Sequence, residues 1–207
     1  MTNQLSGTRP ILCALAAGAA LMVSGCVSLG VEPPERLLTL SSTAVAPAGS
    51  GASTGPENGA GTIAVMTPEV PAKLDVLRVP VNVSETEIAY LQDAFWVEKP
   101  ARLFRRLLGE TLRTRGAALV FDTDDAPVLA SQSVRGTLLD MTYDAPSGSV
   151  IVRFEAIRSG ADGRVVSRRF EAREEGVVAE PAFVGPALNR AANQVASEVA
   201  EWLIDGA

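Results

Sequence analysis

The sequence predicts an α/β domain in which a mixed, largely antiparallel sheet is covered by two main helices. Two segments have helical spacing of apolar residues, one beginning at Pro100 and one covering about 186–204. Short apolar stretches of strand length, separated by Gly, Pro, Asp and Ser, lie before and between these two segments. The resulting order of strands, helix, strands, helix is typical of helices packed on a sheet.

The N-terminus has the pattern of an export signal. Residues 1–10 carry Arg9 and no acidic side chain, and residues 11–23 are continuously apolar or small. That run is shorter than the roughly 20 residues needed to span a bilayer. It closes on Val23-Ser24-Gly25-Cys26, which resembles a bacterial lipobox, in which the cysteine thiol is alkylated by a diacylglyceryl group and the chain is cut before it.

The lipobox predicts a signal peptide at 1–25, a lipid-anchored tether at 26–35 and one domain at 36–207. Cys26 is the expected lipidation site, and several acyl chains together hold a protein stably at a membrane. Val27 stands where an Asp would retain many lipoproteins in the inner membrane, so the periplasmic face of the outer membrane is favoured. A plain secretory signal with an incidental cysteine and an uncleaved N-terminal helix are the alternatives.

Composition excludes several classes of function. Removal of residues 1–25 takes away one of the 18 basic residues and none of the 24 acidic ones, which changes the formal charge from −6 to −7. Nucleic acid is therefore not an expected partner. The chain has no His, and its two cysteines are Cys13 in the signal and Cys26. Without a His or a free thiol, we expect neither an enzyme nor a cofactor.

The first half of the domain is expected to begin with strands. Residues 36–41 predict a first strand, and the Ala-, Gly-, Ser- and Thr-rich segment 43–61 predicts a flexible loop. Residues 62–66 predict a second strand. Residues 74–83 are extended and apolar, and Pro80 within them indicates an edge strand or a bulge.

A hairpin and a helix are expected next. Residues 88–91 and 94–97 flank Gln92-Asp93, which predicts a hairpin with a two-residue turn. Pro100 suits the first helical position, and Gly116 is the expected end of the helix. Its apolar stripe consists of Leu103, Phe104, Leu107, Leu108, Thr111 and Leu112.

The second half predicts an antiparallel meander followed by a helix. Residues 117–121 form a short strand, 122–127 a turn, and 133–143, 150–158 and 164–173 three successive strands. The last helix, at about 186–204, is rich in small residues that allow close docking onto the sheet.

Few residues are candidates for a site. Asp122, Asp124 and Asp125 are close enough in sequence to hold calcium but lack the glycine and closing glutamate of an EF-hand, so a solvated turn is favoured. Trp202 lies in an apolar stripe and is expected in the core, whereas Trp96 suits a core or an interface. Arg113 belongs to the basic side of the first helix, a solvated face or a contact for anionic groups. The candidate partner-contact residues are Tyr90, Trp96, Arg102, Arg105 and Arg106.

These patterns together resemble the ABC-type transport auxiliary lipoprotein family, which includes PqiC-like proteins. The residues that carry the resemblance are the lipobox, Leu37-Leu38-Thr39-Leu40, the segment 74–80, the Tyr90–Trp96 stretch leading into the Pro100 helix, and the terminal Ala- and Asn-rich helix. The segment Leu37-Leu38-Thr39-Leu40 departs from the usual Tyr-Tyr-Thr-Leu by losing two aromatic rings. The resemblance implies a TolB N-terminal-domain-like fold on a lipid tether.

The resemblance also implies a function. Such a protein would be a periplasmic accessory or docking subunit of an ABC system whose MCE-domain subunit carries lipid between the inner and outer membranes. The expected partners are that MCE-domain subunit and the membrane, with a homo-oligomer left open. A structural or regulatory envelope lipoprotein, such as a cell-wall synthesis activator or a secretion-channel component, is the alternative, and lipid binding by the domain itself is a further possibility.

Overall fold

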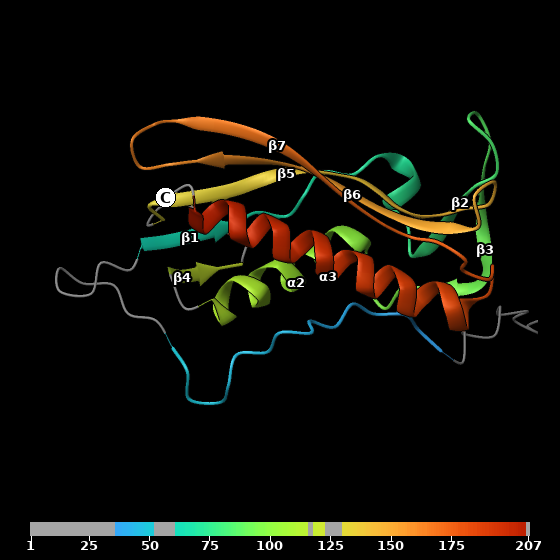
Figure 1. Cartoon of the computed structure of the whole chain (residues 1–207), viewed down its shortest axis with the longest axis horizontal. Helices are drawn as coiled ribbons and strands as arrows, with labels where there is room; N and C mark the ends of the chain where they lie inside the picture. Colours follow the sequence, from blue (N-terminus) through green and yellow to red (C-terminus); the bar gives the residue numbers. More distant parts are fainter. Residues whose placement is uncertain (1–35, 52–60, 116–117, 123–129, 206–207) are drawn as a thin grey trace, which may run out of the picture. The chain divides into compact units, whose positions relative to one another are not determined.

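The computed structural model describes residues 36–51, 61–115, 118–122 and 130–205 of the 207-residue chain. The described residues form two helices, seven strands and one short 3₁₀ turn, η2. The elements in chain order are β1 (Gly61–Val65), η2 (Ala72–Leu74), β2 (Arg78–Asn82), β3 (Ile88–Phe95), α2 (Pro100–Thr114), β4 (Ala118–Phe121), β5 (Gln132–Asp144), β6 (Ser149–Ser159), β7 (Val165–Glu174) and α3 (Pro181–Asp205). The predicted fold class, an α/β domain with a mixed sheet and two helices, is confirmed (Figure 1).

The sheet is organised around β5. One side of β5 pairs with β1 near its beginning and with β2 near its end, both in parallel. The other side of β5 pairs antiparallel with β6, which in turn pairs antiparallel with β7. β4 adds to β1 in parallel and β3 adds to β2 antiparallel. The antiparallel meander β5–β6–β7 predicted from the alternating pattern is therefore present, and β3 and β7 lie at opposite edges of the sheet.

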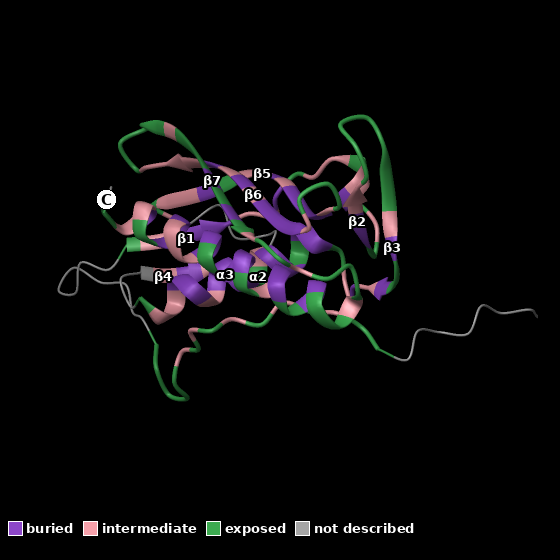
Figure 2. Ribbon diagram, turned by 45° about the vertical axis from the view of Figure 1, so that its right-hand side comes forward, coloured by how far each residue is buried: buried purple, intermediate pink, exposed green. Residues whose placement is uncertain are grey.

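Both helices cover the same face of this sheet, and the buried residues lie between the two layers (Figures 1 and 2). In α2, Pro100 occupies the first turn as predicted, and the apolar stripe is buried. Phe104 of α2 meets Phe154 of β6 with ring centroids 5.1 Å apart. The buried side of α3 is mostly Ala and Val, and these small side chains allow its backbone to approach β6 and β7 closely. Burial of this apolar area is the main stabilising contribution.

The predicted hairpin around Gln92-Asp93 is wrong. Residues 88–95 form one strand, β3, and its antiparallel partner is β2, so the hairpin turn lies at residues 83–87. What resembled a turn is a bulge: Arg78 pairs with Phe95 whereas Pro80 pairs with Tyr90, and Asp93 has a φ of 53°. A residue with positive φ inside a strand shifts the alternation of side chains, which explains the break in the apolar pattern. The bulge expected near Pro80 is present.

Other boundaries also differ from the predictions. Residues 36–41 contribute a single parallel bridge between Leu38 and Trp96 in place of a full strand. The last helix begins at Pro181, five residues before the predicted start, because the carbonyl of Glu180 already accepts hydrogen bonds from Phe183 and Val184. The predicted loop 43–61 includes Gly61 of β1, and its residues 52–60 lie outside the described residues, as does Gly116 at the predicted end of the first helix.

Candidate docking surface

The segment that enters the domain after the predicted tether is fastened to three elements. This strap, residues 38–46, begins where the amide of Leu38 donates to the carbonyl of Phe95 at 2.7 Å, and the amide of Val97 donates to the carbonyl of Leu38 at 2.8 Å. Its middle lies along α3, and the amide of Ala46 donates to Oε1 of Glu110 on α2 at 2.9 Å. The strap therefore fixes the point at which the chain enters the domain.

Asn193 of α3 is the main fastening of the strap. Its side chain is 8% exposed, and its Oδ1 accepts from the amide and the hydroxyl of Thr43 at 2.8 and 3.1 Å. Its Nδ2 donates to the carbonyls of Ser41 and Asn189 at 2.9 and 2.8 Å. Both donor hydrogens of this buried amide are used, as buried polar groups require. One turn away, Oδ1 of Asn189 accepts from the amide of Ser41 at 2.8 Å.

A row of apolar side chains lies on the outer side of β3. The bulge at Asp93 keeps Leu91, Ala94 and Trp96 buried on the inner side. The residues between them are Phe95 and, in the bulge, the exposed polar residues Gln92 and Asp93. The Leu38–Trp96 bridge places the residue before Leu38 beside this outer row, because neighbours of a bridged pair point away from it. We call this row the end ridge, and it consists of Leu37, Ile88, Tyr90, Phe95 and Val97.

The end ridge combines exposed aliphatic side chains with two half-buried aromatic rings. Leu37, Ile88 and Val97 are 51%, 44% and 52% exposed, whereas Tyr90 and Phe95 are half-buried. The guanidinium of Arg78 lies over both rings, 4.9 Å from the centroid of Tyr90 and 5.9 Å from that of Phe95. A cation stacked on aromatic faces is held without an acidic partner, so its charge stays available at the surface.

The predicted partner-contact residues are only partly brought together. Tyr90 belongs to the end ridge, but Trp96 is 1% exposed and is a core residue in this structure. Arg102 and Arg106 of α2 are exposed and both pair with Glu98, Arg102 at 3.6 Å. Arg105 is half-buried and donates to the hydroxyl of Thr67 at 2.8 Å. Arg102 and Arg106 thus share one carboxylate, so the charge of the basic face of α2 is only partly balanced by these pairs.

The remaining candidates have structural roles. Asp122 accepts a hydrogen bond from Arg113 of α2 at 2.7 Å, whereas Asp124 and Asp125 lie outside the described residues. Trp202 is partly buried, packs edge-on against Phe170 with centroids 5.7 Å apart, and carries Arg158 over its ring at 5.2 Å. Within the described ranges, no group of three or more Asp, Glu, Cys or His side chains is arranged to hold a metal ion.

A charged network occupies the sheet face opposite the helices. Asp140 of β5 is 8% exposed and pairs with Lys73 and, at 2.7 Å, with Arg153 of β6. Nε of Arg153 donates to Glu171 of β7 at 2.7 Å, and this hydrogen bond is the main cause that raises the pKa of Arg153 above its ordinary value. Through these ion pairs the network ties η2, β5, β6 and β7 together.

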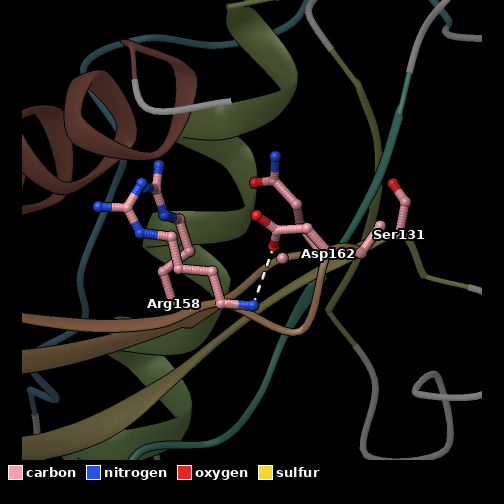
Figure 3. A pocket seen from close by; sticks show the side chains of 7 residues that line it. Ser131, Arg158 and Asp162 are labelled. Atoms are coloured by element: carbon pink, nitrogen blue, oxygen red, sulfur yellow. Dashed lines mark hydrogen bonds between the residues drawn. The ribbon is translucent and has the colours of Figure 1, made fainter.

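The hollows of the described surface are open, and both polar and apolar atoms line them. One of about 280 Å³ lies at the β6–β7 turn and is lined by Ser131, Arg158 and Asp162 among others (Figure 3). Asp162 there accepts from the amide of Arg164 at 2.9 Å, and Arg158 donates to the carbonyl of Trp202 at 3.3 Å. These two side chains therefore already have hydrogen-bond partners, one in the β6–β7 turn and one in α3. Within the described residues, no helix has both the length and the apolarity needed to cross a membrane.

Comparison with known proteins identifies the family. A model of the family described as ABC-type transport auxiliary lipoprotein component matches residues 39–200. The chain belongs to this family. The resemblance inferred from the sequence is therefore confirmed, and the protein is an auxiliary lipoprotein of ABC-type transport, a class that resides in the cell envelope. A search of curated proteins found no match.

Two solved structures share the fold of this auxiliary lipoprotein. Protein XCC0632 from Xanthomonas campestris is 18% identical, with a TM-score of 0.62, and the match covers 74% of this chain and 91% of that one. The crystal structure of an uncharacterized protein is 15% identical, with a TM-score of 0.61, and the match covers 69% of this chain and 91% of that one. At these identities, the likeness establishes the fold alone.

Sequence reasoning missed the end ridge and the Asn193 fastening. The alternation of Ile88 and Tyr90 was visible in the sequence, but the bulge hid its continuation to Phe95 and Val97. The partners of Asn193 lie about 150 residues away in the chain, and no local pattern indicates them.

Proposed function

We propose that this auxiliary lipoprotein is a non-enzymatic docking subunit of an MCE-type ABC lipid transport system, anchored by lipid on Cys26 to the periplasmic face of the outer membrane. The observation that carries the proposal is the family match over residues 39–200. The N-terminal apolar run, which ends in a lipobox at Cys26, supports it. Residues 1–25 are then the removed signal, 26–35 the tether and 36–207 the domain. Cys26 itself lies outside the described residues.

The sheet offers a long free edge for a transporter segment. β7 is ten residues long and, among the described elements, pairs only with β6. An exposed edge can bind an extended peptide through its backbone amides and carbonyls, and side chains on alternate sides give specificity. Arg169, Glu171 and Arg173 are exposed along β7, and Arg169 pairs with Glu155 of β6 at 3.2 Å, so the edge carries charges of both signs. Affinity at this edge would therefore come mainly from backbone hydrogen bonds.

Lipid anchoring is tested by Cys26→Ser. We expect this change to move the protein from the membrane fraction to the soluble fraction, because it removes the atom that is alkylated. Mass spectrometry of the mature N-terminus of the wild-type protein should show the diacylglyceryl modification. Persistent membrane association of Cys26→Ser would refute the anchor.

Docking is tested by photo-crosslinking in cells. A photoreactive amino acid at Ser167 or Arg169 should form a crosslink to the MCE-domain subunit, identified by mass spectrometry. The matched control is Gln194, which is exposed on α3 and has only a local bond to Glu198. If the MCE subunit is co-isolated and crosslinks form at position 194 but not at the β7 positions, the β7 edge is not the docking site. Absence of any ABC-transport subunit from detergent-extracted complexes would refute the proposed function.

A further inference from the structure

The end ridge lies where the chain enters the domain. Leu37 belongs to the ridge, and the next residue, Leu38, is fixed to β3 by two backbone hydrogen bonds. The side chain of Leu38 also packs against α3, since a Cβ on Gly185 would lie 2.7 Å from its Cδ2. Figure 1 shows β3, the start of the strap and the start of α3 at the same end of the sheet. The ridge is therefore attached to the tether with no intervening loop.

Chain length limits what the tether can bring to a membrane. Leu37 follows Cys26 by 11 residues, which span about 40 Å at most at roughly 3.3–3.6 Å per residue. α3 has 25 residues and starts beside the strap, so at about 1.5 Å per residue its far end is about 37 Å away. The far end can approach the lipid only if the tether is almost fully extended. Any shorter conformation of the tether keeps the end of the domain that carries the ridge nearer to the lipid than the far end of α3.

The chemistry of the ridge suits a lipid–water interface. Leu37, Ile88 and Val97 expose aliphatic carbon, and aromatic residues such as Tyr90 favour the headgroup level, where one end of the ring is apolar and the other polar. Arg78 is stacked on the rings and can donate to lipid phosphate. In the part of the chain that the structure describes, only Arg78 lies over the two aromatic rings, and the aliphatic members of the row stay exposed.

We propose that the end ridge lies against the headgroup region of the anchoring membrane, so that the domain sits on the bilayer in one orientation. The proposal rests on the lipidation of Cys26 in the proposed function. The contact is apolar in the main, because Asp93 in the bulge and Glu85 and Glu87 in the adjacent turn do not favour anionic lipid. It should therefore form on neutral phosphatidylcholine and persist at high salt.

Site-specific fluorescence tests this orientation in the full-length lipidated protein. After processing, Cys13 is gone and Cys26 is alkylated, so a single introduced cysteine can be labelled cleanly. Val97→Cys and Ile88→Cys report on the ridge. Val165→Cys is the matched control, because Val165 is a 58% exposed valine on β7, at the opposite edge of the sheet. Each variant carries an environment-sensitive nitrobenzoxadiazole label and is reconstituted into phosphatidylcholine vesicles with or without spin-labelled lipid as a quencher.

We expect spin-labelled lipid to quench the label at 97 and 88 at least twofold more than the label at 165, and aqueous iodide to show the reverse order. Equal quenching at the three positions, in vesicles with which the protein floats, would overturn the ridge contact and leave the transport role standing. Shielding of position 97 only when the MCE subunit is added would also overturn it, in favour of a protein contact. If no variant co-floats with the vesicles, both the proposed lipid anchor on Cys26 and the ridge contact would be overturned.

Discussion

Removal of the Asn193 side chain should loosen the strap that joins the tether to the domain. Asn193→Ala deletes three hydrogen bonds to the strap, two accepted from Thr43 and one donated to Ser41. At about 1 kcal/mol per bond, the loss is about 3 kcal/mol. The strap is only partly buried, so water replaces some of these bonds, and Ala gains about 0.6 kcal/mol in helix propensity over Asn. The net expectation is a loss of about 2 kcal/mol in the free energy of unfolding.

For a domain of this size, a loss of about 2 kcal/mol corresponds to a fall in Tm of about 4–8 °C. Thermal and urea unfolding measure the global loss, and amide hydrogen exchange of Leu38 to Thr43 reports on the strap itself. The matched control is Gln194→Ala on the same helix, whose exposed side chain bonds only to Glu198 and should change stability by less than about 0.5 kcal/mol. An Asn193→Ala protein with wild-type stability and wild-type protection of the strap amides would refute the fastening role.

Two further substitutions test the sheet. Gly136→Ala should destabilise the domain by about 3 kcal/mol or more, because a Cβ there would lie 1.9 Å from the carbonyl oxygen of Glu155 on the neighbouring strand. The control is Gly51→Ala, because Gly51 has open space around it. Equal urea midpoints for the two variants would contradict the clash. Asp140→Asn should lower the free energy of unfolding by about 1–3 kcal/mol, since it leaves Lys73 without its carboxylate partner in a largely buried network. The control is Asp75→Asn, which removes an exposed ion pair and should lower the free energy of unfolding by less than about 0.5 kcal/mol. Similar losses for the two variants would refute a special role for Asp140.

Elements that depend on local interactions were predicted more accurately from the sequence than contacts between distant parts of the chain. The α2 helix was predicted with its start at Pro100 because its apolar stripe and its N-terminal proline are local signals. The strands β5, β6 and β7 were predicted because each alternates in sequence and short turns join them. Elements with local signals and adjacent partners were therefore found almost to the residue.

The misses concern contacts between distant parts of the chain. β3 was divided into two strands because the bulge at Asp93 interrupts its alternation, and only pairing with β2 shows that it is continuous. The segment around Leu38 was given a full strand, yet after its single bridge to Trp96 the chain turns to follow α3, where Asn189 and Asn193 provide its hydrogen bonds. Neither the positive φ of Asp93 nor the partners of Asn193 has a signature in the local sequence.

The two proposed surfaces lie on opposite edges of one sheet, and this arrangement has a mechanical consequence. Along the sheet, β3 is followed by β2, β5, β6 and β7, so three strands separate the strand that would contact the bilayer from the proposed docking edge. Neighbouring strands are about 4.8 Å apart, so the free edge of β7 is held about 20 Å from β3. The strap keeps this orientation because it fixes the entering chain to β3, α3 and α2 at once. A lipid anchor alone would leave the domain free to rotate, whereas an anchor with a ridge and a strap would hold the docking edge in one orientation relative to the bilayer.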